Sequence, residues 1–288
     1  MNAFVRLAEG RDIEAICSLL HTKMNSRIPV ERWRQLMSYE WFSEKPDYGR
    51  VVESDGDILG FCGMVYADRT LANNERVERI VSMSSWYLDK SVRGKGLGKA
   101  MLKSAIEDPT LTYATLTNSR KPLGIVEALG FRVLEDHRYL WRKEKAVVTS
   151  INLLHDAASI KLLVKPYQRE IIDDMANLSV VPMLLQVDGQ QTLLFFSIKR
   201  KKNDILWFDL MYVSDRVLFT RNAQAVASAL LPDEPSILAA DGRLVHKPSS
   251  EIEYEPLPVA RYFVSQRVEP YELDNLYSEL QLLDLKLD

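Results

Sequence analysis

Residues 86–100 read Trp-Tyr-Leu-Asp-Lys-Ser-Val-Arg-Gly-Lys-Gly-Leu-Gly-Lys-Ala. The apolar start of this stretch predicts the end of a strand, and Lys99–Glu107 predicts a helix with one apolar face. Between them, Gly94, Gly96 and Gly98 predict a tight turn that leaves room for a ligand beside the backbone. A strand, a glycine-rich turn and a helix start together present free backbone N–H groups at the positive end of a helix dipole. Such a site suits a phosphate or pyrophosphate.

Two common phosphate-binding loops do not fit this stretch. A Walker A loop has four residues between its first glycine and Gly-Lys-Ser/Thr, whereas three residues separate Gly94 from Gly98 here. Lys99 is also followed by Ala100, so the hydroxyl that would bind magnesium is missing. The dinucleotide fingerprint G-x-G-x-x-G has no third glycine in register.

The pattern that does fit is Arg-x-x-Gly-x-Gly, formed by Arg93, Gly96 and Gly98. It resembles the acyl-CoA pyrophosphate loop of the GNAT (Gcn5-related N-acetyltransferase) superfamily. Residues 128–131, Ala-Leu-Gly-Phe, are similar to the Leu-Gly-Phe that ends the fourth helix of that family. The resemblance covers residues 1–143. Taken alone, the glycine turn has a simpler interpretation as an ordinary helix cap.

The order of expected elements agrees with this resemblance, which implies an α/β (α+β) fold with a mixed central sheet flanked by helices. In order, we expect strand 4–8, a helix over 13–24, a second helix that begins after Pro29 and ends before Pro46, strands 50–53, 58–66 and 77–88, helix 99–107, strand 111–117, helix 120–129, and two strands, one from 131 and one over 138–142. A polar connection is expected over 68–76.

The second half of the chain repeats this order weakly. The charged residues 143–145 mark a boundary, which predicts a GNAT acyl-CoA-binding domain over 1–143 and a degenerate GNAT-like domain over 144–288. Residues 214–219 stand where the first half has its glycine turn, and they contain no glycine. We therefore expect the second domain to bind no CoA and to shape the acceptor cleft. An amphipathic helix is expected over 274–287.

Composition excludes several classes of partner. The net charge is −3, which gives no basic field for nucleic acid or an anionic membrane surface. No apolar run approaches the roughly 20 residues of a membrane-spanning helix, so a cytoplasmic protein is expected. Cys17 and Cys62 are expected to be reduced core residues, and the four histidines show no metal-ligand spacing, so no metal is expected. The oligomeric state is not fixed by the sequence.

The GNAT resemblance implies acetyl-CoA, or another acyl-CoA, as the cofactor. The backbone around Leu88 and Lys90 would pair with the pantetheine arm and donate to the thioester carbonyl, and Asn118 would meet the far arm of the cofactor. The residues implied to bind pyrophosphate are Val92, Arg93, Gly94, Lys95, Gly96, Leu97, Gly98 and Lys99.

The catalytic residues depart from the family pattern. Where many GNAT enzymes have a glutamate base, this chain has Ser82 and Ser84 in the run Ser-Met-Ser-Ser. Glu78 lies on the same face of the strand by period-two alternation, and it could act through a chain of waters. The simpler interpretation of Glu78 is a solvated residue beside Arg76 and Arg79.

The usual tyrosine acid is also missing, because Val126 falls near its position. Other tyrosines could replace it, namely Tyr87, Tyr113 and Tyr139. An acid is dispensable where the leaving thiol has a pKa near 8.5 and the acceptor amine is weakly basic, as in an amino sugar.

The sequence therefore predicts an N-acyltransferase that moves an acetyl group from acetyl-CoA to an amine. Residues 46–49, 84–87 and 276–280 resemble bacterial GNAT-like proteins associated with surface-polysaccharide synthesis, which implies an amino-sugar acceptor. Two alternatives stay open. One is a non-catalytic acyl-CoA-binding module that regulates or scaffolds a partner, and the other is an enzyme that acetylates a protein or peptide amine.

Overall fold

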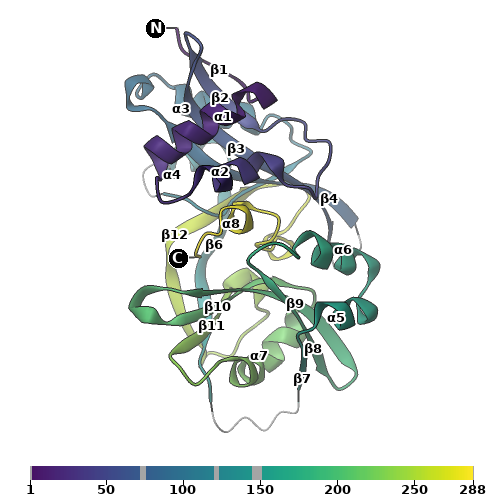
Figure 1. Cartoon of the computed structure of the whole chain (residues 1–288). Helices are drawn as coiled ribbons and strands as arrows, with labels where there is room; N and C mark the ends of the chain where they lie inside the picture. Colours follow the sequence, from purple (N-terminus) through teal and green to yellow (C-terminus); the bar gives the residue numbers. More distant parts are fainter. Residues whose placement is uncertain (1, 72–75, 120–122, 145–150, 288) are drawn as a thin grey trace.

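A computed structural model describes residues 2–71, 76–119, 123–144 and 151–287. Within these residues, twelve strands form one continuous mixed sheet with helices packed against it (Figure 1). The strands are β1 Phe4–Leu7, β2 Gly49–Ser54, β3 Asp57–Leu71, β4 Arg76–Leu88, β5 Thr112–Thr115, β6 Arg132–Trp141, β7 Asn152–Leu154, β8 Val181–Val187, β9 Gln190–Arg200, β10 Leu206–Val213, β11 Ser236–Asp241 and β12 Glu253–Val264. The helices are α1 Ile13–Leu19, α2 Val30–Ser38, α3 Leu97–Ala105, α4 Leu123–Ala128, α5 Ala157–Leu163, α6 Pro166–Asp174, α7 Arg216–Leu230 and α8 Glu279–Leu282.

The two halves of the chain contribute strands to each other. The sheet order is β1-β2-β3-β4-β5-β12-β6-β11-β10-β9-β8-β7, so β12 of the second half lies between β5 and β6 of the first. In turn β6 pairs with β11 of the second half. A strand from beyond the predicted domain boundary therefore completes the N-terminal half of the sheet, and the division at residue 143 stays a prediction.

This exchange corrects the expectation of two strands over 131–142. The segment forms one continuous strand, β6. Residues 134–138 read Leu-Glu-Asp-His-Arg and contain no glycine, proline or asparagine to reverse the chain. The place beside β5 goes to β12 instead, with Tyr262 opposite Thr115 and Val264 opposite Tyr113.

Two hairpins, one in each half of the chain, have the same turn. Asp55 and Gly56 join β2 to β3 with φ values of 54° and 89°. Asp188 and Gly189 join β8 to β9 with φ values of 49° and 77°. Two positive φ angles in a two-residue turn match the twist of the flanking strands, which explains the Asp-Gly pair in both halves.

Two expectations about element ends were wrong, and a third held. β3 continues through the predicted polar connection to Leu71, because Arg69 is buried there and donates to Asp274 at 2.6 and 3.0 Å. The first helix ends at Met24 as expected, but its last turn, Leu20–Met24, is π-helical and leaves Met24 43% exposed. The helix expected over 274–287 is reduced to α8, with left-handed residues on either side of it.

A shared core joins the halves. One apolar cluster includes Ala114 of β5, Phe195 of β9 and Leu280 of α8. Figure 1 shows α8 in the middle of the molecule, between the N-terminal and C-terminal halves of the sheet. Among the described residues, no helix has the length and apolar character required to span a bilayer.

Candidate functional site

The glycine turn lies between β4 and α3, as the sequence predicts. Gly94 and Gly96 have φ values of 79° and 78°, a left-handed conformation that side chains other than glycine adopt with strain. No atom lies within 4 Å of a Cβ added to either residue. Glycine is therefore required by the backbone conformation, and the space beside the turn is open to a ligand.

Hydrogen bonds hold the turn against the end of β4. The Arg93 Nε–H donates to the Leu88 carbonyl at 2.8 Å, and the Asp89 carboxylate accepts from the backbone N–H and hydroxyl of Ser91. Val92 is fully buried and anchors the turn in the core. The side chains of Lys95 and Lys99, in contrast, are exposed. The turn thus presents cationic side chains and the N-terminus of α3 to solvent, which suits an anionic ligand.

The central strands diverge next to this turn. β4 pairs in parallel with β5 only where Ile80–Ser82 faces Thr112–Ala114. Beyond Ser82, residues 83–88 have no partner strand on that side among the described residues. Because buried backbone groups require hydrogen-bond partners, this free edge can pair with an extended ligand that carries amides.

A bulge in β4 lies at the point of divergence. Ser84 faces Gly63 of β3, Tyr87 faces Phe61, and between them Ser85 has a φ of 53°. A Cβ on Gly63 would lie 2.9 Å from the Ser84 Oγ, so glycine permits the close approach. The buried Ser84 hydroxyl has no hydrogen-bond partner among the described residues. It is therefore free to bond a ligand.

A cavity of about 320 Å³ occupies the space between the diverging strands. Its lining is largely apolar with hydroxyl and amide groups on part of its wall. The lining residues are Met24, Asn25, Ile28, Trp33, Cys62, Met83, Ser84, Ser85, Trp86, Leu102, Thr115, Thr117, Asn118, Ser119, Val126, Phe131, Glu279, Leu283 and Leu285.

Glu279 of α8 reaches this cavity from the C-terminal half of the chain. Its side chain is fully buried, and its two carboxylate oxygens accept hydrogen bonds of 2.7 Å from the hydroxyls of Ser82 and Thr117. Burial raises the pKa of Glu279 above its usual range, and the two hydroxyl hydrogen bonds partly oppose this shift.

A buried charge cluster fixes the segment that precedes Glu279. Asp241 accepts from Arg243 at 2.7 Å, from Asn275 at 2.8 Å and also from Arg261. Arg243 in turn donates to the Asn275 side chain at 2.7 Å. The cluster ties Asn275 to the core of the second half.

Asn275 then sets the start of α8. Its carbonyl accepts from the hydroxyl of Ser278 and the amide of Gln281, both at 2.9 Å. Ser278 caps the helix by accepting from the Leu280 N–H. Residues of the C-terminal half thus hold Glu279 in place, and its carboxylate accepts hydrogen bonds from residues of the N-terminal half.

The structure separates the predicted catalytic residues. Ser84 lines the cavity. Ser82 does not line it, but its hydroxyl donates a hydrogen bond to Glu279, which does. Glu78 lies outside the cavity lining, buried and within 3.0 Å of the guanidinium groups of Arg76 and Arg267. Alternation places Glu78 on the same face of β4 as Ser82, but the two arginines balance the negative charge of its carboxylate. Its catalytic role stays a prediction.

Among the predicted cofactor residues, Asn118 lines the cavity and is held by its own hydrogen bonds. Its amide donates to the Thr115 and Ala260 carbonyls at 3.2 and 3.1 Å, and its oxygen accepts from Thr115. The bond to Ala260 depends on β12. This wall of the cavity is therefore partly positioned by the second half.

Among the described residues that line the cavity, none is a phenol and the one thiol is not activated. Burial raises the pKa of the Cys62 thiol to about 12, so it stays protonated near neutral pH. Val126, which stands near the position of the usual tyrosine acid, lines the cavity. No tyrosine is among the described lining residues. Tyr113 donates to the Asp108 carbonyl instead.

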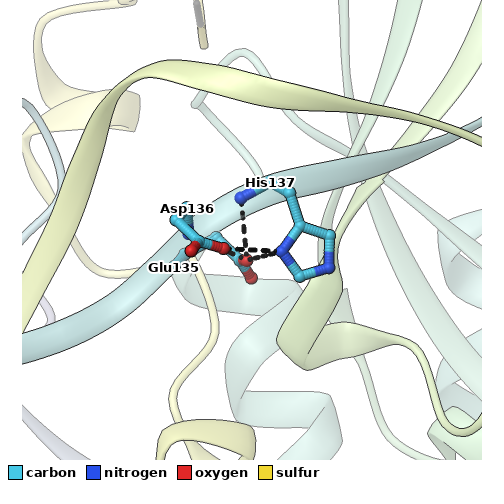
Figure 2. A group of neighbouring side chains, drawn as sticks. All are labelled: Glu135, Asp136 and His137. Carbon is cyan, nitrogen blue, oxygen red and sulfur yellow. Dashed lines mark hydrogen bonds and ion pairs between the residues drawn. The ribbon is translucent and has the colours of Figure 1, made fainter.

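Glu135, Asp136 and His137 of β6 form a separate group whose donor atoms lie within 4.8 Å of one another (Figure 2). His137 Nδ1 lies 2.7 Å from the Asp136 carboxylate, and Glu135 accepts from the Arg243 backbone N–H at 2.8 Å. Because Glu135 is buried against Arg243, we assign it to the charge cluster between the halves.

Glu279 is the residue that the sequence analysis missed. Its signal is a carboxylate on an apolar stripe, since it lies three residues after Leu276 and four before Leu283. A charged residue at that position is buried with hydrogen-bond partners or exposed by a break in the helix. Here it is buried, with partners from β4 and the segment after β5.

Residues 13–109 match the family model of the acetyltransferase (GNAT) family. The matched segment contains β4, the glycine turn and α3. No curated protein matches the chain in sequence.

Solved structures with the GNAT fold resemble the whole chain. A probable N-acyltransferase from Enterococcus faecalis V583 has a TM-score of 0.55 at 10% identity, over 94% of this chain and 74% of its own. A GCN5-related N-acetyltransferase from Kribbella flavida has a TM-score of 0.53 at 10% identity, over 91% and 71%. A tandem GNAT protein from the clavulanic acid biosynthesis pathway has a TM-score of 0.51 at 11% identity, over 91% and 98%. The predicted GNAT fold is confirmed, and the tandem relative fits the two-part layout.

Proposed function

We propose that the chain is an N-acyltransferase that transfers an acetyl group from acetyl-CoA to a small amine by direct attack in a ternary complex. The observation that carries this proposal is the glycine turn with left-handed Gly94 and Gly96, which opens onto α3 beside the divergent strands. A pyrophosphate at the turn places the pantetheine arm along the free edge of β4. The thioester then lies in the cavity, where a backbone N–H can polarise its carbonyl.

We further propose a hydroxylated, weakly basic amine as the acceptor, with an amino sugar as the first candidate. Hydroxyl and amide side chains line part of the cavity, and they can exchange hydrogen bonds with sugar hydroxyls; among them are Asn25, Thr115 and Ser119. A peptide acceptor remains the alternative enzyme function.

The test begins with calorimetric titration of the protein with acetyl-CoA. Acetyl-pantetheine is the matched control, because it keeps the thioester and lacks the pyrophosphate. We expect micromolar binding of acetyl-CoA and binding of acetyl-pantetheine weaker by at least about 100-fold, since charge-assisted hydrogen bonds are lost. Equal binding of the two ligands, or binding of neither, would contradict the phosphate role of the turn.

An acceptor screen follows, with release of the CoA thiol as the readout and glucosamine and galactosamine as the first amines. The rival proposal is a non-catalytic acyl-CoA-binding module, which Val126 at the cavity wall favours. Tight binding of acetyl-CoA without amine-dependent thiol release, across sugar and peptide amines, would support the rival.

A further inference from the structure

We propose that Glu279, supplied by the C-terminal half, is the general base that takes a proton from the acceptor ammonium in the cavity of the N-terminal half. This inference rests on the proposed function. It assigns to the second half a direct part in the reaction, whereas the sequence predicts only that this half shapes the acceptor cleft.

The position of Glu279 is the first argument. Among the described residues that line the cavity, Glu279 is the sole carboxylate. It lies where β4 and β5 separate, because its partners are Ser82, the last β4 residue paired with β5, and Thr117, two residues beyond β5. An amine that attacks a thioester between these strands approaches the same place.

The hydrogen bonds of Glu279 leave room for a further donor. Each carboxylate oxygen accepts one hydroxyl proton, from Ser82 or Thr117. The backbone N–H of Glu279 also contacts the carboxylate. An ionised carboxylate has about four lone-pair sites, so these three donors leave one site for an ammonium N–H. The two hydroxyls also fix the orientation of the group before the substrate arrives.

The charges around Glu279 differ from those around other buried carboxylates. Asp241 and Glu78 each contact two arginines, whereas no cation among the described residues lies within ion-pair distance of Glu279. β4 presents the Ser82 hydroxyl, the segment after β5 presents Thr117, and Arg261 of β12 is the cation whose field lowers the pKa. Burial outweighs these effects, so the pKa of Glu279 is raised above its usual range, which makes the carboxylate a stronger proton acceptor.

The proposed step balances in protons and bonds. The acceptor ammonium gives one N–H proton to the Glu279 carboxylate, and the freed lone pair forms the C–N bond with the thioester carbon. The C–S bond breaks and CoA leaves as a thiolate, and the nitrogen, which became positively charged on attack, releases its second N–H proton to solvent water. One proton then passes from the Glu279 carboxyl to the thiolate, directly or through water, which regenerates the carboxylate. This return proton also compensates for the missing tyrosine acid at Val126.

A purely structural role is the competing explanation, because Glu279 also fastens α8 to β4 and the segment after β5. The test therefore uses Glu279→Gln, which keeps the shape and one acceptor oxygen, and Glu279→Asp, which keeps the carboxylate on a shorter side chain. Glu78→Gln is the matched comparison, since Glu78 is the other candidate base. Each variant is titrated with acetyl-CoA and then assayed for thiol release with glucosamine from about pH 5 to pH 9.

We expect Glu279→Gln to bind acetyl-CoA as the wild type does and to lose about 100-fold in kcat, the lower end of general-base contributions. The rise of kcat/KM with pH should disappear in this variant, persist in part in Glu279→Asp, and persist fully in Glu78→Gln. A kcat of Glu279→Gln within about threefold of wild type, or an unchanged rise with pH, would overturn the inference and leave the proposed function standing.

The failure of the proposed function has a different signature. A wild-type protein that binds no acetyl-CoA, or that binds it without amine-dependent thiol release, would overturn both the acyltransferase proposal and the role of Glu279. Disappearance of the rise with pH in Glu78→Gln, with Glu279→Gln unaffected, would move the base to Glu78 and overturn this inference alone.

Discussion

The two halves of the molecule each place a helix after a central strand, but they satisfy the free N–H groups of that helix differently. In the first half, Gly94 and Gly96 leave the start of α3 open. In the second half, the Asp215 carboxylate accepts hydrogen bonds of 2.9 Å from the N–H groups of Val217 and Leu218 at the start of α7. One side chain of the protein thus occupies, at the start of α7, the position that we propose for the pyrophosphate at the start of α3.

The cavities beside the two helices differ in the same way. A cavity of about 450 Å³ lies beside α7, and its acidic and basic lining residues include the ion pair of Arg69 with Asp274. The carboxylate of the first cavity, Glu279, accepts hydrogen bonds from two hydroxyls and, among the described residues, has no cation within ion-pair distance. The comparison teaches that the first cavity keeps polar groups available, whereas at the second cavity an ion pair between the two halves stabilises the fold.

The largest expected effect concerns the exchange of strands. Expressed alone, residues 1–143 should show no cooperative unfolding transition, because β5 loses its partner β12 and the core loses α8. Denaturant unfolding followed by circular dichroism measures this, and co-expression with residues 144–288 is the control that should restore the transition. A folded 1–143 fragment that binds acetyl-CoA would show that the first half is independent.

Next in size is a change that makes the first turn resemble the second. Gly96→Asp should weaken acetyl-CoA binding by at least about 100-fold, because a carboxylate repels the pyrophosphate at short range. Gly96→Asn is the matched control: it has the same shape and tolerates a left-handed φ, but it carries no charge. Calorimetry should show a smaller loss for Asn, and equal losses would mean that the conformation matters and the charge does not.

A smaller effect is expected for the arginine of each turn. Arg93→Ala should weaken acetyl-CoA binding about tenfold, the value of one charge-assisted hydrogen bond, and the loss should shrink at high salt. Arg216→Ala, at the first residue of α7, is the control and should leave the affinity unchanged. An equal loss in both variants would indicate a general charge effect instead of a site at the first turn.

The smallest effect tests whether Asp215 acts as an internal cap. Asp215→Ala should lower the free energy of unfolding by about 1 kcal/mol, and Asp215→Asn by less, because asparagine keeps an acceptor oxygen. Urea unfolding measures both. Neither variant should gain a second acetyl-CoA site in calorimetry, since the left-handed glycines are also absent. A second site in Asp215→Ala would mean that the carboxylate alone blocks an otherwise intact pocket.

The local features of the fold and cofactor site could be predicted from the sequence. The order of the glycines after an apolar strand, the Asp-Gly hairpin turns and the apolar spacing of α3 are determined by residues close together in the chain. Each follows from backbone conformation and periodicity, so neighbours suffice to specify it. The absence of glycine at residues 214–219 likewise predicted that the two turns differ. It did not predict that the Asp215 carboxylate caps α7.

Only the tertiary structure decided which distant residues meet. Sequence periodicity could not show that β12 pairs with β5, because strand exchange depends on pairing between edges that lie more than a hundred residues apart. Periodicity also could not show that Glu279 reaches Ser82 and Thr117. In place of the long helix expected over 274–287, the chain forms the short helix α8, which Ser278 caps and which has a left-handed residue on either side. The glycine turn is specified locally, whereas the packing of the whole chain brings the proposed base to the cavity.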